Sequence, residues 1–240
     1  MKLNQKGQLD LEYYFEEIEK RGIIEVDKWP KNIELSWYEG IHHKRTACIY
    51  MDIRKYSERV SKDFIDTYKY LQLFYLNSWE IISKYGGYVE KQTGDGIMIV
   101  YPIDDDEKIL DPLKLANEIL ESTRNNLNTF MQSHNENKYI IGLGVDVSEV
   151  IVTKVGLPKH EHHLMLVGDS ANMAAKMCEL AFDSIYVGCN YKTLVDENFR
   201  DHCDFELIAH LPYTIGEHKL SEEKNYNVFK FISFNVNNKL

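Results

Sequence analysis

The sequence feature that most constrains the fold is an Asp-Gly turn between two short segments rich in strand-forming residues. Residues 88–91 and 97–101 form these segments, and Thr93-Gly94-Asp95-Gly96 joins them. Asp-Gly between two such segments is a strong hairpin signal, because glycine accepts the positive φ that tight hairpin turns need. The segment therefore predicts two antiparallel strands with the carboxylate of Asp95 at their turn.

The residues before this hairpin predict a buried strand followed by a long helix. Residues 47–51 form an apolar run that ends at Asp52, as in a strand buried on both faces. From Ser57 to about Lys84, apolar residues recur at spacings of three and four, which predicts one helix with a single apolar stripe. The stripe consists of Phe64, Tyr68, Leu71, Tyr75, Trp79 and Ile82. Gly86-Gly87 ends the helix.

The downstream patterns complete the predicted order of elements. They predict a helix over 112–131, a strand pair over 139–147 and 150–155, a strand over 164–167, a helix capped by Asp169-Ser170, and strands over 185–188, 205–209 and 228–232. From residue 47 the order is strand, helix, strand, strand, helix, strand. This order predicts an α+β fold of the ferredoxin-like or palm type, βαββαβ, with helices on one face of a mainly antiparallel sheet and additional C-terminal strands.

Charge and hydropathy exclude two classes of partner. The net charge is −10, so no nucleic acid partner is expected, although an acidic chain can bind a triphosphate through metal ions. No apolar run approaches the roughly 20 residues that span a bilayer, and residues 1–20 are too polar for a signal peptide. We expect a cytoplasmic protein with no membrane partner, in which Cys48 and Cys178 are reduced core thiols.

Two acidic residues are candidate metal ligands. Asp52 ends the buried strand and Asp95 lies in the hairpin turn, and in a palm-like sheet these two positions are neighbours. Carboxylates suit hard divalent cations, and two such ions about 3.5–4 Å apart can activate an attacking oxygen and stabilise a leaving pyrophosphate. Taken singly, each residue is equally explained as a strand terminator or a turn residue. Taken together, they favour a metal site.

Other polar groups are weaker candidates. Arg54 and Lys55 stand at a strand-to-helix junction that suits phosphate, and solvated side chains are the alternative. Asn172 and Lys176 are four residues apart and share one helix face, which suits a ribose and a phosphate but is more simply an exposed polar face. The run His160-Glu161-His162-His163 has no spacing for a closed metal site, so a solvated loop is expected.

Four segments together resemble one family. They are MDIRKYS (51–57), GGYVEKQTGDGIMIVY (86–101), GLGVDVSEVIVTKVG (142–156) and LMLVGDSANMAAKM (164–177). In this order they resemble the conserved-motif blocks of class III adenylate and guanylate cyclases, which convert a nucleoside triphosphate into a cyclic mononucleotide and pyrophosphate. The resemblance implies an N-terminal helical extension over 1–40, a catalytic domain over 41–235 and a tail over 236–240.

The resemblance also assigns roles. Asp52, Asp95 and the carbonyl of Ile53 match the ligands of two divalent cations, Mn²⁺ or Mg²⁺. The other matched positions are Lys91 for the base, Asn172 for the ribose, and Lys176 where the family usually has Arg. Arg54 would help to neutralise the triphosphate. Because the family's site forms between two catalytic domains, the resemblance implies a homodimer with two shared active sites.

Three departures bear on the base. Met165 stands where adenylate cyclases usually carry Asp or Thr, Tyr56 stands where Phe is usual, and Ser148 replaces a usual Gly. With these changes the chain resembles the Pycsar-type pyrimidine cyclases of bacterial antiphage defence, which implies UTP or CTP as substrate, UTP being favoured, and an effector that the sequence does not identify. The alternatives are an adenylate cyclase and a catalytically silent, nucleotide-sensing regulatory domain.

Overall fold

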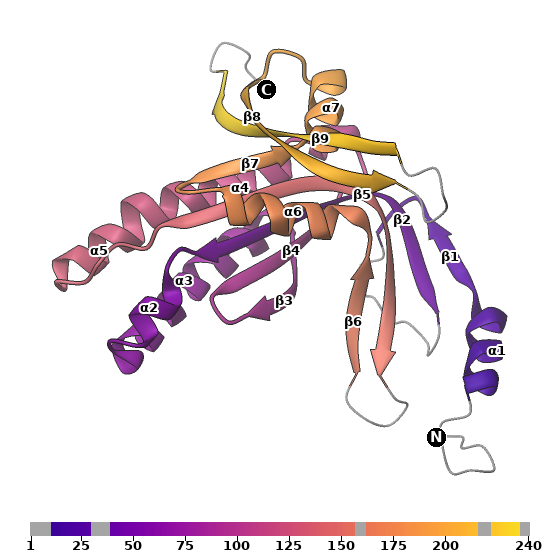
Figure 1. Cartoon of the computed structure of the whole chain (residues 1–240), viewed down its shortest axis with the longest axis horizontal. Helices are drawn as coiled ribbons and strands as arrows, with labels where there is room; N and C mark the ends of the chain where they lie inside the picture. Colours follow the sequence, from indigo (N-terminus) through magenta and orange to yellow (C-terminus); the bar gives the residue numbers. More distant parts are fainter. Residues whose placement is uncertain (1–10, 30–38, 157–161, 216–221, 236–240) are drawn as a thin grey trace.

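The computed structural model describes residues 11–29, 39–156, 162–215 and 222–235, and in these residues the strands form one twisted sheet (Figure 1). The strands are β1 Ile23–Val26, β2 Gly40–Ile53, β3 Tyr88–Thr93, β4 Gly96–Pro102, β5 Ile141–Gly156, β6 His162–Val167, β7 Ser184–Gly188, β8 Cys203–Ile215 and β9 Glu222–Phe234. The helices are α1 Leu11–Arg21, α2 Tyr56–Val60, α3 Phe64–Tyr85, α4 Asp111–Ser122, α5 Asn128–Ser133, α6 Asp169–Leu180 and α7 Cys189–Asn198.

The sheet has the predicted βαββαβ arrangement at its centre. Its strand order is β3-β4-β2-β5-β7-β9-β8, with β1 paired to β2 and β6 paired to β5. The elements β2, α3, β3, β4, α4 and β5 form the ferredoxin-like unit, in which β2 is antiparallel to both β4 and β5. The strands β7, β9 and β8 extend the sheet, so the prediction of additional C-terminal strands is confirmed.

Alternate residues of β2 serve two different faces of the sheet, because successive strand side chains point to opposite sides. Ile49 and Met51 pack into the main core with α3 and α4, whereas Cys48 packs with Met98 and with Ala174 of α6. Figure 1 shows α6 on the near side of the sheet and α3 and α4 on the far side. Helices therefore cover both faces, which corrects the prediction that they lie on one.

The predicted helix from Ser57 to Lys84 is two helices. It breaks after Val60, and Asp63 starts α3 by accepting a hydrogen bond of 3.0 Å from the backbone N–H of Asp66. Only part of the predicted stripe is core: Leu71, Tyr75 and Ile82 are buried, whereas Phe64, Tyr68 and Trp79 are exposed. The face that the sheet covers is set by Phe74, Ser78 and Ile81 as well, and it is rotated from the stripe that spacing alone suggested.

Several other boundaries differ from the prediction. Residues 139–155 are not a strand pair but mostly one long strand, β5, which pairs with β2 and then with β6. The predicted helix over 112–131 is α4 and α5 joined by a π-helical turn over Thr123–Leu127. The predicted helical extension also contains a strand, β1, which pairs in parallel with β2, and α7 had no clear periodic signal. Pairing with neighbouring strands decided the cases of β5 and β1, and local pattern does not record such pairing.

The thiols and the hydropathy of the helices raise two further points. Cys48 and Cys178 are free and buried, as predicted. Burial raises the pKa of each thiol to about 12, so both stay protonated. No helix in the described residues is long and apolar enough to cross a bilayer.

Helix α6 approaches β5 closely at a glycine. A Cβ on Gly144 would collide with the carbonyl oxygen of Ala174 and would lie 2.7 Å from the backbone N of Cys178. Backbone atoms in a packed helix cannot move aside as a side-chain tip can, so the sheet tolerates only glycine at this point.

We therefore expect Gly144→Ala to lower the free energy of unfolding by about 2–3 kcal/mol through overpacking. Gly40→Ala is the matched control, because its Cβ would meet a side-chain tip, Ile151 Cγ2 at 3.1 Å, and should cost far less. Urea unfolding followed by circular dichroism measures both. Equal stability of the two variants would contradict the close approach of α6 to β5.

Candidate active site

Asp52 and Asp95 lie side by side at one end of the sheet. In the β2–β4 ladder Met51 pairs with Ile97, so the next residue of β2 arrives beside the β3–β4 turn. A Cβ on Gly96 would lie 3.4 Å from Asp52 Oδ1. Burial, and then the Asp52 charge, raise the pKa of Asp95 to about 6. The register of two strands therefore brings together the two carboxylates that the sequence singled out.

Backbone groups partly offset the rise in the Asp95 pKa. Backbone hydrogen bonds of Ile53 and of Asp95 itself act to lower this pKa. They do not outweigh burial and repulsion, so the net shift is upward. Ile53 is itself buried, which fixes its backbone next to the two carboxylates.

The donor set fits a divalent cation. Two carboxylates forced together repel each other, and a cation bound between them would remove that cost. Within the described part of the chain, no three His, Cys, Asp or Glu side chains form a group that could hold a metal ion. A cation at Asp52 and Asp95 would therefore need further oxygen ligands, such as the Ile53 carbonyl, water or a bound phosphate.

Two tyrosines anchor the turn that carries Asp95. The hydroxyl of Tyr75, on α3, donates to the Gly94 carbonyl, and Tyr50 Oη lies 2.7 Å from Thr93 Oγ1. The sequence analysis treated Tyr75 only as a member of an apolar stripe. A tyrosine at a buried helix position is the available signal, because a buried phenol usually finds a polar partner.

Tyr56 stands at the start of α2 and packs partly against the main core. Burial, and then the charge of Asp95, raise its pKa. The Asp95 charge therefore acts on the hydroxyl that distinguishes Tyr56 from phenylalanine. Its predicted contact with substrate stays a prediction.

The guanidinium of Arg54 contacts both Asp52 and helix α6. Its Nη1 lies 3.6 Å from Asp52 Oδ2, and its Nη2 donates to the Cys178 carbonyl. Its Nε is buried and has no hydrogen-bond partner in the described structure. Arg54 thus ties the end of β2 to α6, and that contact uses part of the hydrogen-bonding capacity predicted for a triphosphate.

Asn172 and Lys176 are both exposed on one face of α6. At the other end of the helix, Cys178 contacts Arg54 and therefore the Asp52 side of the sheet. Asn172 precedes Cys178 by six residues, about 9 Å along the helix axis. The residue predicted to orient the ribose is thus displaced from the Asp52 of its own chain.

The start of α6 differs from the prediction. The N-cap is Gly168, and Asp169 and Ser170 are already helical. The backbone N–H of Ser170, in the first turn of the helix, donates to Ser148 Oγ of β5 at 3.1 Å. Ser148 stands where the family that this sequence resembles usually has glycine. Its side chain therefore caps the helix that carries Asn172.

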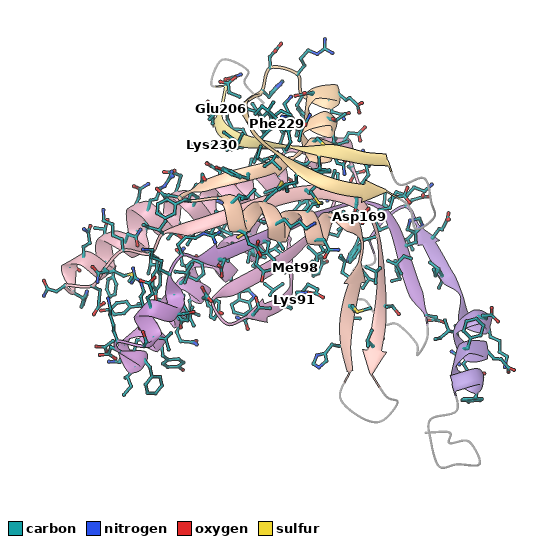
Figure 2. All side chains as sticks on the ribbon, viewed as in Figure 1. Lys91, Met98, Asp169, Glu206, Phe229 and Lys230 are labelled. Atoms are coloured by element: carbon teal, nitrogen blue, oxygen red, sulfur yellow. The ribbon has the colours of Figure 1, made fainter. Side chains whose placement is uncertain are left out.

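Lys91 and Met165 lie on strands that border one cavity. Lys91 pairs with Met98 across the β3–β4 hairpin, and Figure 2 shows the two side by side, apart from Asp169 at the start of α6. Met165 of β6 lines a cavity of about 150 Å³ together with Glu90, the neighbour of Lys91. Of the predicted loop 160–163, His160 and Glu161 lie outside the described residues, whereas His162 and His163 belong to β6.

The Asp52–Asp95 pair predicts a pH-dependent stability in the absence of metal. The folded pKa of Asp95, about 6, lies above its ordinary value of 3.8. The ionised group therefore destabilises the fold above pH 6, and this cost disappears as the pH falls toward 3.8. Asp95→Asn keeps the hydrogen-bond acceptor and removes the charge.

In EDTA at pH 7.5 we expect Asp95→Asn to exceed wild type by on the order of 1 kcal/mol, after allowance for screening at this half-exposed site, or about 2–4 °C in Tm. The gap should close at pH 4. Glu80→Gln, on the exposed side of α3, is the control and should show neither effect. A less stable Asp95→Asn variant at pH 7.5 would contradict the repulsion.

Comparison with known proteins bears on the fold. No protein-family model matches the sequence, and no curated protein matches it significantly. Solved structures that resemble the chain include the guanylyl cyclase Cya2, with a TM-score of 0.66, 16% identity, and coverage of 82% of this chain and 95% of that chain.

Two further solved structures are similar. The adenylyl cyclase CyaB from P. aeruginosa has a TM-score of 0.67 at 15% identity, covering 84% of this chain and 100% of its own. The guanylate cyclase domain of RhGC from Catenaria anguillulae, in complex with GTP, has a TM-score of 0.64 at 15% identity, covering 81% and 99%. At such identities the likeness concerns the fold, and the chain has the fold of a class III nucleotidyl cyclase catalytic domain.

Proposed function

We propose that this chain is a nucleotidyl cyclase, which converts a nucleoside triphosphate into a cyclic mononucleotide and pyrophosphate. The observation that carries the proposal is the Asp52–Asp95 carboxylate pair, held by strand register on this fold. A protein that needed the fold only as a scaffold would have no reason to retain two mutually repelling carboxylates. Residues 41–235 would form the catalytic domain, with 1–40 as a helical extension and 236–240 as a tail.

The predicted metal-binding and catalytic residues each have a role in this proposal. Asp52, Asp95 and the Ile53 carbonyl would hold two divalent cations, Mn²⁺ or Mg²⁺. Such ions lower the pKa of a bound hydroxyl and stabilise charge on phosphate oxygens. The chain's own residues supply position: Asn172 orients the ribose so that its 3′-OH faces the α-phosphorus in line, and the ammonium of Lys176 faces the phosphate. Lysine, as a point charge, lacks the bidentate fork of arginine.

The proposed site is shared between two chains. Asn172 and Lys176 are exposed on α6, and Asn172 is displaced from the Asp52 of its own chain. In a twofold-symmetric homodimer, Asn172 and Lys176 of one protomer complete the site at Asp52 and Asp95 of the other, and two equivalent sites result.

For the base, we propose a pyrimidine, with UTP favoured over CTP and with adenylate cyclase activity as the alternative. Met165 offers only a weak sulfur acceptor to an adenine amino group, and the cavity that it lines is small, about 150 Å³. The product would act as a second messenger, and antiphage defence is the setting that the Pycsar-type resemblance suggests.

The first test is product formation. Purified protein with Mn²⁺ and each of ATP, GTP, CTP and UTP should yield a cyclic mononucleotide, identified by mass spectrometry. Asp52→Asn and Asp95→Asn should each lower turnover by at least about 10³-fold, because the metal-binding charge is lost, while Glu80→Gln should match wild type. If wild type gives no product from any of the four nucleotides, a catalytically silent, nucleotide-sensing domain replaces the cyclase as the proposed function.

The second test addresses the shared site. Asp52→Ala and Asn172→Ala chains should each be inactive alone, because each removes one half of both sites. Mixed in equal amounts and allowed to exchange, they should recover on the order of a quarter of wild-type turnover, since half of the dimers then carry one intact site. Two Asp52→Ala preparations mixed together should recover nothing. The absence of rescue in the first mixture, with exchange verified, would contradict the dimer.

A further inference from the structure

The wall of the cavity beside Met165 includes polar groups to which the proposed mechanism assigns no role. The cavity lies between β3, β4 and β6, and its wall includes Trp29, Tyr88, Glu90, Val100, Met165 and Leu166. Most of these side chains are apolar or aromatic, as in sites that bind a flat organic ring. Trp29 reaches this wall from the segment after β1, outside the ferredoxin-like unit, and its ring lies 5.5 Å from His43 and 6.3 Å from Tyr88.

Two buried polar atoms on this wall have no hydrogen-bond partner among the residues that the structure describes. They are Nε1 of Trp29, a donor, and Oε2 of Glu90, an acceptor. The side chain of Glu90 is only 13% exposed, and its nearest cation, Lys91 Nζ, is 3.9 Å away, beyond hydrogen-bond distance. Buried donors and acceptors without partners are costly and uncommon. A ligand in the cavity would satisfy both.

A β-bulge explains why Glu90 is available here. In the β3–β4 ladder Val89 pairs with Ile99 and Lys91 pairs with Met98, so Glu90 is an additional residue without a partner. In a regular strand, residues 90 and 91 would point to opposite faces, and a bulge allows two consecutive side chains to share one. Lys91 pairs with Met98, and Glu90 lines the cavity with Leu166; Met98 and Leu166 belong to the cluster on the α6 side of the sheet. Val89 packs into the main core on the other side.

We propose that Glu90 and Trp29 are the specificity-determining residues of the base site, reading the edge of a uracil ring together with Lys91. This inference rests on the proposed cyclase function and goes beyond it. Uracil presents a ring N–H between two carbonyls, which is acceptor, donor, acceptor. A uracil ring bound in the cavity would donate its N–H to the Glu90 carboxylate, and its two carbonyls would accept from the Trp29 N–H and the Lys91 ammonium.

The same set disfavours the other bases. Cytosine and adenine place an acceptor nitrogen where uracil has its ring N–H, so the Glu90 carboxylate would meet a lone pair. Guanine retains a ring N–H, but its exocyclic amino group would meet the Trp29 N–H, donor against donor. Because an unsatisfied buried polar group is penalised more than a missing methylene, such sites discriminate strongly. Glu90 thus selects against cytosine and adenine, and Trp29 selects against guanine.

The test compares substrates within each variant. For wild type, Glu90→Gln and Trp29→Phe, kcat/KM is measured for UTP, CTP, ATP and GTP with Mn²⁺. Glu90→Gln offers an amide N–H to the cytosine nitrogen, so the UTP/CTP ratio should fall by at least about tenfold. Trp29→Phe keeps the ring and removes the donor, so the UTP/GTP ratio should fall while the UTP/CTP ratio changes little. Glu80→Gln makes the same charge change on α3 and should leave both ratios unchanged.

A second readout does not need turnover. Binding of UTP and of CTP to wild type and to Glu90→Gln is measured by calorimetry with Ca²⁺, and wild type should favour UTP while the variant loses that preference. If wild type produces no cyclic product but shows this binding pattern, the cyclase proposal fails and the base site stands. If wild type cyclises CTP or ATP better than UTP, or if Glu90→Gln leaves the UTP/CTP ratio within about twofold, the base site fails and the cyclase proposal stands.

Discussion

The antiparallel pairing of β2 with β4 is the constraint on which the site depends. This ladder places Met51 opposite Ile97, so the next residue, Asp52, lies beside the turn that contains Asp95. A slip by one residue would turn Asp52 into the main core and would move Ile49 and Met51 to the α6 face. The core burial of Ile49 and Met51 therefore also fixes the position of a carboxylate that contributes nothing to the core.

The carboxylate pair in turn organises what surrounds it. Arg54 bridges from Asp52 to the Cys178 carbonyl, and Tyr75 bridges from α3 to the turn at Gly94. Elements on both faces of the sheet are thus connected to the same end of β2. A site held from two sides can keep two like charges together, because neither side chain can relax away without breaking contacts to a packed helix.

The sequence was informative where a local pattern and the tertiary structure agree. The β3–β4 hairpin, β2, β6 and α6 were predictable because turn chemistry or an apolar pattern identifies them. The turn itself is Gly94-Asp95 and not Asp95-Gly96, because Gly94 takes the positive φ and Gly96 already pairs with Thr93. Sequence reasoning misjudged β5, since Ser148-Glu149 looks like a turn but lies within the strand, where Ser148 still pairs with Thr46 and the register shifts next to it. Ser148 also caps α6. It also overestimated the burial of Phe64, Tyr68 and Trp79, because spacing gives the period of a helix but not the direction from which a sheet covers it. The proximity of Asp52 and Asp95 followed from topology, whereas the cavity at Trp29 and Glu90 depends on a bulge and on a segment outside the ferredoxin-like unit.

The bulge at Glu90 also determines how this region can change. A bulged residue is supernumerary, so its deletion would restore regular pairing without altering the order or the ends of β3 and β4. Such a deletion would remove the carboxylate from the cavity wall while the hairpin and the Asp95 turn persisted. Glu90, which would contact the base, can therefore be lost by a deletion, and Asp95, which would bind metal, can be changed by a substitution. Either change leaves the other residue in place.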